Sequence, residues 1–226
     1  MKKVFLILLA FTGITFATAA QENKTMYLMK RDAIIRKIAL SDIDSLTFHK
    51  PEIDGVIING TIWAARNVGA PGKFAATPED AGMLYQWNSK TGWSISSDYS
   101  EWDSNWTGNG ATNWEITNNV CPTGYRVPTR SELNALINSA KEWTTINGAG
   151  GWIFGSGEDT VFLPAAGYRE LDGKLFLTGS HGYYWSSTGY EDVSIAYCGI
   201  DFQNGKINIG AYYNRAYGFS VRCIAE

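Results

Sequence analysis

The sequence predicts an α+β domain, in which antiparallel strands form the main sheet and one amphipathic helix packs against it. The first observation is a set of three turn signals, at Asn59-Gly60, Asp172-Gly173 and Asn204-Gly205, each between short apolar runs. Such pairs supply the positive φ angles of two-residue type I′ turns, so each predicts an antiparallel hairpin. The second observation is a capping box from Thr129 to Glu132, which marks the start of a helix.

The predicted helix extends from about residue 129 to about residue 142. After the capping box, four apolar residues recur at helical spacing, namely Leu133, Leu136, Ile137 and Ala140. This spacing places them on one face of an α-helix, which predicts that the face is buried. A weaker pattern predicts a second helical stretch over residues 78–85, and residues 148–157 are interpreted as a glycine-rich loop.

The first 20 residues predict a secretory signal peptide. Two lysines follow the initial methionine, the run from Val4 to Phe11 is apolar, and small residues occupy positions 17–20. A membrane anchor is the alternative, but a span requires about 20 apolar residues and this run is shorter. No cysteine precedes Cys121, so lipid attachment near the cleavage site is not expected. We expect the mature chain to be extracellular, on the cell surface or in the periplasm, with no transmembrane segment after cleavage.

Two further regions follow the predicted signal peptide. Residues 21–52 form a short β-rich segment, with strands expected over residues 25–30, 34–40 and 46–48. This segment is too small to bury a core of its own. From residue 53 to residue 226 the composition shifts to glycine, asparagine, tryptophan and tyrosine, which predicts one main domain.

Composition narrows the classes of partner. The chain of 226 residues has a formal net charge of −3 and no long run of lysine or arginine. Nucleic acid is therefore not an expected partner, because phosphate binding needs a basic face. The three cysteines suit an exported chain that keeps a disulfide, although an odd number leaves at least one thiol over.

Five motifs, in order along the chain, resemble those of the Fibrobacter succinogenes major paralogous domain family. They are the segments 63–69 (WAARNVG), 121–129 (CPTGYRVPT, followed by Glu132), 161–169 (VFLPAAGYR), 182–188 (GYYWSST) and 220–223 (SVRC). The resemblance covers about residues 53–225. Residues 21–52 resemble a short segment that is common on exported proteins of Bacteroidetes.

The resemblance implies a fold related to the C-type-lectin-like and formylglycine-generating-enzyme-like folds. Such a fold has a twisted antiparallel sheet, helices packed on it and long loops on one side. The resemblance also implies a disulfide between Cys121 and Cys223, because the two places meet in a lectin-like fold. A metal-binding or catalytic thiol is the alternative for these cysteines.

Three arginines lie within the motifs, and we expect them to have a structural role. They are Arg126, Arg169 and Arg222. Pairing with buried carboxylates such as Glu132 or Glu170 is the expected arrangement, and an anion site is the alternative.

The candidate ligand-binding residues lie in the long polar and aromatic stretch from residue 89 to residue 120. They are Trp93, Trp102, Asp103, Asn105, Trp106 and Trp114. Aromatic faces stack on the C–H groups of sugar rings, and nearby amides and carboxylates bond hydroxyl groups, so this composition suits a partly apolar glycan site. The alternative is that the tryptophans bury a large area and fix the long loop to the core.

No catalytic or metal-binding constellation stands out in the sequence. His49 and His181 are the only histidines and lack zinc-site spacing, and no Gly-x-Ser-x-Gly elbow is present. The Glu-Pro-Asn and Gln-Pro-Asp triplets of calcium-dependent lectins are absent. Cys198, as a single leftover thiol, cannot supply the cysteine pair that formylglycine-generating enzymes use. We expect no cofactor and no metal.

Taken with the resemblance, these features favour a non-enzymatic binding or adhesion module whose partner is a glycan or a surface protein. The alternative is a structural component of a cell-envelope or surface assembly, in which residues 21–52 provide a docking strand. An enzyme of the formylglycine-generating type is the least favoured interpretation.

Overall fold

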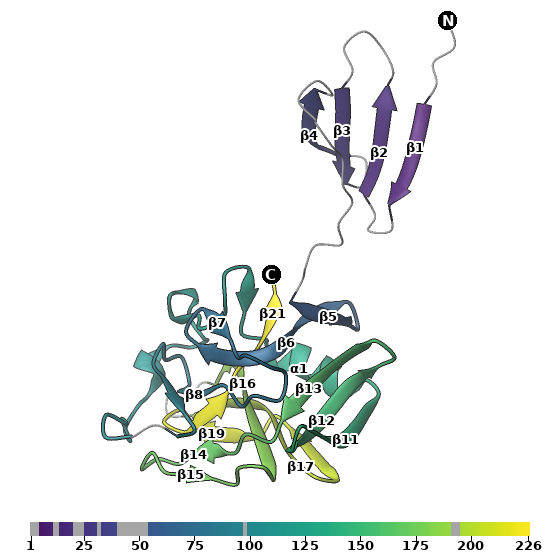
Figure 1. Ribbon diagram of the computed structural model, residues 1–226. Coiled ribbons are helices and arrows are strands. Elements are labelled where there is room, and N and C mark those ends of the chain that lie inside the picture. Colours follow the sequence, from purple (N-terminus) through teal and green to yellow (C-terminus); the bar gives the residue numbers. More distant parts are fainter. Residues whose placement is uncertain are drawn as a thin grey trace, which may run out of the picture. The chain divides into compact units, whose positions relative to one another are not determined.

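The computed structural model describes residues 5–10, 14–19, 25–30, 33–39, 54–96, 99–190 and 195–226, and the chain divides into two compact units, Met1–Glu52 and Ile53–Glu226. The first unit contains a four-stranded antiparallel sheet whose strands follow chain order (Figure 1). They are β1 (Phe5–Ala10), β2 (Ile14–Ala19), β3 (Thr25–Lys30) and β4 (Ala33–Ala39).

Two of the three strands expected after the signal peptide are present in this sheet. β3 matches the strand expected over residues 25–30, and β4 begins and ends one residue before the strand expected over 34–40. The strand expected over residues 46–48 lies outside the described residues, as does His49. β1 and β2 occupy the stretch that the sequence assigns to a signal peptide, and that assignment remains a prediction.

Three sheets make up the described part of the second unit. The first has the order β10 (Tyr125–Arg126), β21 (Arg222–Ala225), β6 (Thr61–Ala70) and β5 (Gly55–Ile58), with β7 (Lys73–Phe74) paired to β6. The second consists of β11 (Lys141–Ile146), β12 (Ala149–Ser156) and β13 (Asp159–Pro164).

The third sheet is the largest and has the order β15 (Leu175–Phe176), β14 (Tyr168–Arg169), β20 (Gly218–Ser220), β16 (His181–Gly189), β17 (Ile195–Gln203) and β18 (Lys206–Ile209). Beside this path, β19 (Tyr212–Asn214) pairs with β17, β8 (Met83–Gln86) with β20, and β9 (Gly92–Ser94) with β8. β16 and β20 are parallel, whereas the other named strand pairs of this sheet are antiparallel. The predicted α+β class, with antiparallel sheets and one helix, is confirmed.

Helix α1 (Arg130–Ile137) begins at the predicted capping box. The Thr129 hydroxyl accepts a hydrogen bond from the backbone N–H of Glu132, and the Glu132 carboxylate accepts one from the backbone N–H of Thr129. Leu133, Leu136 and Ile137 are buried, as the apolar stripe predicts. Leu133 packs directly on Gly199 of β17, where an added Cβ would lie 1.8 Å from its Cδ1 atom. The glycine thus allows the helix to approach the sheet closely.

The helix is shorter than the sequence predicts, because residues 141–156 form a hairpin. β11 and β12 pair antiparallel across Asn147-Gly148, whose φ angles are 47° and 88°. This is a two-residue turn with both φ angles positive, as a type I′ turn requires. The predictions of a helix continuing to residue 142 and of a glycine-rich loop over 148–157 are therefore wrong.

The stretch from Pro78 to Tyr85 is also not helical in the structure. Met83–Gln86 forms β8, and Leu84 and Tyr85 are fully buried against the rest of the third sheet. Gly82 has a φ of 68°, which a helix does not accommodate. The tertiary partner β20 thus decides the conformation of a segment with weak local preference.

Two of the three predicted hairpin turns connect their strands across two residues. Asn59-Gly60 joins β5 to β6 with φ angles of 49° and 80°, as type I′ requires. Asn204-Gly205 joins β17 to β18, but only the glycine has a positive φ, so this turn is not type I′. The Asp172-Gly173 pair lies in a longer loop, because β14 ends at Arg169 and β15 begins at Leu175.

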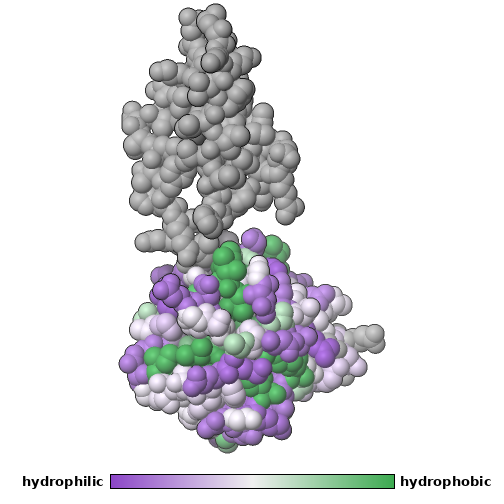
Figure 2. Space-filling view, turned by 90° about the vertical axis from the view of Figure 1, so that its right-hand side faces the viewer, coloured by the Kyte–Doolittle hydropathy of each residue, from purple (hydrophilic) through white to green (hydrophobic). Residues whose placement is uncertain are grey.

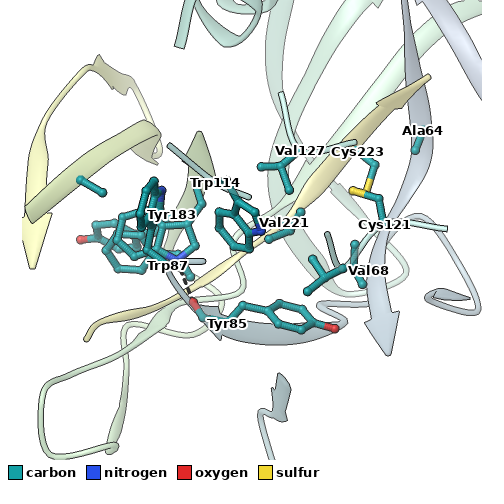
Figure 3. Packing of buried hydrophobic residues seen from close by; sticks show 14 of the residues in the cluster. Ala64, Val68, Tyr85, Trp87, Trp114, Cys121, Val127, Tyr183, Val221 and Cys223 are labelled. Atoms are coloured by element: carbon teal, nitrogen blue, oxygen red, sulfur yellow. Dashed lines mark hydrogen bonds between the residues drawn. A yellow bond between two sulfur atoms is a disulfide. The ribbon is translucent and has the colours of Figure 1, made fainter. Parts of the chain in front are cut away.

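A disulfide lies within one of the two cores of the second unit (Figure 3). Cys121, just before β10, and Cys223, on β21, form the bond that the resemblance implies, with their Cα atoms 6.0 Å apart. Both residues are buried beside Val68 and Val221. The bond therefore ties the last strand to the segment that leads into the helix.

Candidate functional site

A polar cavity of about 290 Å³ opens beside the long loop that follows β8. Two tryptophans, two carboxylates and one lysine line it together with several amides and hydroxyls. The lining residues are Gln86, Asn88, Ser89, Lys90, Thr91, Trp93, Glu101, Asp103, Trp106, Asn109 and Asn118. The two carboxylates and the one ammonium group give this wall a formal charge of −1 at pH 7.

Trp106 is held in place through both its backbone and its indole ring. Its backbone N–H donates to the carbonyl of Asp103, and its Nε1–H donates to the carbonyl of Trp87 at 2.7 Å. A buried indole usually satisfies its N–H in this way. Since the ring is half-buried and lines the cavity, it offers a preformed apolar surface to a ligand.

The loop behind Trp106 is fixed by a buried arginine. The Arg215 Nη1 group donates to the carbonyls of Thr107 and Ala111, at 3.1 and 2.7 Å, and the guanidinium lies 4.1 Å from the ring centroid of Trp87. Gly108 lies so close to Trp87 that an added Cβ would be 2.8 Å from the indole. These contacts tie the cavity wall to buried residues of the domain.

Two buried amides form the polar floor of the cavity. The Asn88 side chain donates to the carbonyl of Gly108 and accepts from the backbone N–H of Glu115. The Gln86 side chain donates to the carbonyls of Asp103 and Ala216. Asn88 has a φ of 60°, a left-handed conformation that asparagine tolerates better than most residues. These amides hold the loop in place, whereas exposed groups at the rim face solvent.

The rim carries the groups that a ligand meets first. Lys90, Thr91, Glu101 and Asp103 are exposed and line the cavity. One Asp103 carboxylate oxygen accepts the backbone N–H of Asn105, which fixes the direction of the side chain. Carboxylates accept hydrogen bonds from ligand hydroxyls, and an ammonium group donates them.

Trp93 and Trp102 contact each other but have different surroundings. Their ring centroids lie 4.7 Å apart in an edge-to-face arrangement. Trp102 packs on Gly173 and Gly218, where an added Cβ would lie 2.9 and 2.6 Å from its ring. Its Nε1 atom is buried and has no hydrogen-bond partner among the described residues. Trp93, on β9, is half-buried and lines the cavity, so Trp102 supports it from behind.

The structure brings together three of the six predicted ligand-binding residues, namely Trp93, Asp103 and Trp106. The other three do not line this cavity. Trp102 is packed on two glycines, and Asn105 lies at the surface. Trp114 is buried, donates its Nε1–H to the carbonyl of Asn118, and lines a different cavity of about 330 Å³.

Sequence reasoning missed most of the polar lining. The missed residues are Gln86, Asn88, Ser89, Lys90, Thr91, Glu101, Asn109 and Asn118. Several adjoin the predicted tryptophans in sequence, so proximity was a usable signal for Lys90 and Thr91. Gln86 and Asn88 gave no local signal, because their roles depend on loop residues that are distant in sequence.

The three arginines of the motifs have structural roles. Arg126 forms a bidentate ion pair with Glu132, at 3.0 and 2.6 Å, as expected. Arg222 instead donates to the carbonyls of Ala64 and Phe162 and to the Asn67 side chain, and burial lowers its pKa to about 10. Arg222 therefore joins β21 to β6 and β13.

Arg169 likewise bonds backbone carbonyls, donating to Gly173 and Ser94. The carboxylate of Glu170 accepts from the Tyr168 hydroxyl instead. The expected pairing between a motif arginine and Glu170 is thus not what the structure shows.

Among the described residues, no group of three or more histidines, cysteines, aspartates or glutamates is arranged to bind a metal ion. No helix in this part of the chain is long and apolar enough to cross a bilayer.

The comparison with known protein families finds a match to part of the chain. The profile of a family described as a domain of unknown function, DUF8237, matches residues 152–224, from β12 to β21. This stretch covers less than half of the chain and includes Cys223. It contains none of the cavity residues, because all of them lie between positions 86 and 118. No curated protein and no solved structure matches the chain.

Proposed function

We propose that the protein is an exported, non-enzymatic binding module that recognises a glycan in the cavity between Trp93 and Trp106. The observation that carries the proposal is the composition of this one cavity, in which two indole rings lie beside carboxylates, amides, hydroxyls and an ammonium group. Sugar rings present C–H faces and hydroxyl edges, and this lining offers a partner to each.

The size of the cavity limits the ligand. Sites for drug-sized molecules occupy roughly 300–1,000 Å³, and this cavity, at about 290 Å³, lies just below that range. One or two sugar units of a longer chain therefore fit best. The fixed positions of Trp106 and its supporting loop reduce the entropy that binding would otherwise cost.

Export is supported by the predicted signal peptide and by the disulfide, because disulfides persist in oxidising compartments. The five motifs that resemble the Fibrobacter succinogenes major paralogous domain support the same proposal, since members of that family are exported proteins.

A glycan array tests the proposal with matched variants. The wild-type chain is compared with a Trp93→Ala/Trp106→Ala variant and with Trp152→Ala, which removes a half-buried tryptophan that lies on β12 and does not line the cavity. Circular dichroism checks that each variant is folded. We expect at least one glycan to bind the wild type and Trp152→Ala but not the double variant. Equal binding by all three chains, or no bound glycan, would contradict the proposal.

A further inference from the structure

Four tyrosines form a closed cluster on the third sheet, away from the cavity described above. The tyrosine cluster consists of Tyr168 on β14, Tyr183 on β16, Tyr213 on β19 and Tyr217 in the turn before β20. Successive ring centroids, from Tyr168 through Tyr183, Tyr213 and Tyr217 back to Tyr168, lie 4.7, 5.7, 5.9 and 5.8 Å apart. All four rings contact Phe219, which is fully buried.

The cluster reaches the surface of the domain. Tyr168, Tyr213 and Tyr217 are half-buried, whereas Tyr183 is 8% exposed. Phe176, which is 41% exposed, extends the aromatic surface beyond Tyr168 at a centroid distance of 6.1 Å. On the face of the second unit shown in Figure 2, hydrophobic side chains lie in small patches between hydrophilic ones. The tyrosine cluster and Phe176 thus form a contiguous group of aromatic rings that reaches solvent.

Two carboxylates accept hydrogen bonds from the tyrosine cluster. The Tyr168 hydroxyl donates to Glu170 at 3.0 Å, and the Tyr213 hydroxyl donates to Asp201 at 3.4 Å. Asp201 also accepts from the Asn208 side chain, but its Oδ1 atom is buried without a hydrogen-bond partner in the described residues. Neither carboxylate takes part in an ion pair within the part of the chain that the structure describes.

The Tyr168 hydroxyl remains protonated and keeps donating to Glu170 at neutral pH. Burial, then the hydrogen bond and charge of Glu170, raise the pKa of Tyr168 to about 12. Burial and the same carboxylate also raise the pKa of Tyr217. A phenol that donates to a carboxylate has a more electron-rich ring, so the aromatic faces and the carboxylates create negative potential together.

Positive groups nearby do not neutralise this potential through ion pairs. Lys174 has an electrostatic interaction with Glu170, but its ammonium group forms an ion pair with Asp172 at 2.6 Å. His181 stacks on Tyr183, with the ring planes 11° apart, and its Nδ1 atom hydrogen-bonds the Ser180 hydroxyl. The aromatic surface and its two carboxylates therefore complement a cation and disfavour an anion.

We propose that the tyrosine cluster, with Glu170 and Asp201, is a second binding site, which takes an alkylated ammonium cation. The diffuse charge of such a cation is attracted to aromatic faces and requires no hydrogen-bond acceptor of its own. The site is separate from the proposed glycan site, because none of its residues lines that cavity. Either site stands if the other fails.

Choline chloride is the probe. The matched control ligand is 3,3-dimethyl-1-butanol, an uncharged analogue of choline in which carbon replaces the nitrogen. Both are titrated into the purified full chain, and the tyrosine ring signals are followed by nuclear magnetic resonance. We expect saturable choline binding that is at least about tenfold tighter than binding of the neutral analogue. No saturable choline binding, or equal binding of the two ligands, would overturn the proposal.

Variants test the role of the carboxylates. Asp201→Asn and Glu170→Gln each remove one charge with little change in shape, and we expect each to weaken choline binding by about fivefold. Asp159→Asn makes the same chemical change at an exposed aspartate on β13 and is expected to bind as the wild type does. If one carboxylate variant does not fold, choline binding by the other variant tests the role of the carboxylates. Unchanged binding in a folded carboxylate variant would contradict the assignment.

Discussion

Removing the disulfide gives the sharpest prediction about stability. The bond joins residues that are 102 positions apart, so it closes a loop that includes β10 to β20 and helix α1. In the chain-entropy model, a loop of this length stabilises the folded state by about 4.7 kcal/mol at 25 °C, because it restricts the unfolded chain. Both cysteines are buried in the core, so their replacement by alanine adds a small packing loss.

The assay is equilibrium unfolding in urea, followed by tryptophan fluorescence. The Cys121→Ala/Cys223→Ala variant should unfold about 2 M earlier than the wild type, if unfolding has a slope of about 2 kcal/mol per molar urea. The wild type in reducing buffer should behave as the variant does. A decrease of less than about 1 kcal/mol in the free energy of unfolding would refute the entropic argument.

Thiol titration in denaturant provides the independent control. The chain has three cysteines, and the disulfide uses two, so one thiol should react before reduction and three should react after it. Three reactive thiols before reduction would show that the bond does not form.

Three further predictions concern packing, pH and the cavity wall. Gly199→Ala should destabilise the fold by about 1–3 kcal/mol, because the new methyl group overlaps Leu133. Leu133→Ala should therefore destabilise the Gly199→Ala variant less than it destabilises the wild type. Urea unfolding measures both effects, and additive losses of stability would contradict this prediction. Burial opposes the charge of Glu132, but hydrogen bonds from Arg126 and the helix cap outweigh it and hold its pKa below the ordinary value of 4.5. The stabilising effect of the Glu132 carboxylate is therefore complete well above pH 4.5 and disappears as the pH falls through the lowered pKa. The difference in stability between wild type and Glu132→Gln should shrink on acidification. A difference that stays constant with pH would refute the assignment. Arg215→Met should destabilise the fold by about 3 kcal/mol, because the carbonyls of the loop lose a charged donor, and unchanged thermal unfolding would contradict it.

Local signals were sufficient to predict several elements of the fold. The β5–β6 hairpin follows from Asn59-Gly60, and the start of helix α1 follows from the Thr129–Glu132 capping box, because both depend on residues adjacent in sequence. The end of the helix does not follow from the apolar spacing, because Ala140 continues that spacing whereas the chain forms the β11–β12 hairpin around Asn147-Gly148.

The candidate site was only partly predictable for a related reason. Trp93, Trp102 and Trp106 have similar sequence surroundings, and the structure distinguishes them through distant contacts. Trp102 is covered by Gly173 and Gly218, which lie far along the chain, whereas Trp106 reaches the carbonyl of Trp87 and lines the cavity. Composition therefore indicated the right loop, and tertiary packing decided which of its residues reach a ligand.

Nuclear magnetic resonance of the indole N–H groups tests the glycan site most directly. The nine tryptophans report on different parts of the chain, so a glycan selected on the array can be titrated into the labelled protein and located. We predict the largest shifts at Trp93 and Trp106, with Trp143 and Trp152 unchanged, because these two contact each other on the β11–β12 hairpin and do not line the cavity. Shifts at Trp143 and Trp152 without shifts at Trp93 and Trp106 would place the ligand elsewhere and contradict the proposed site.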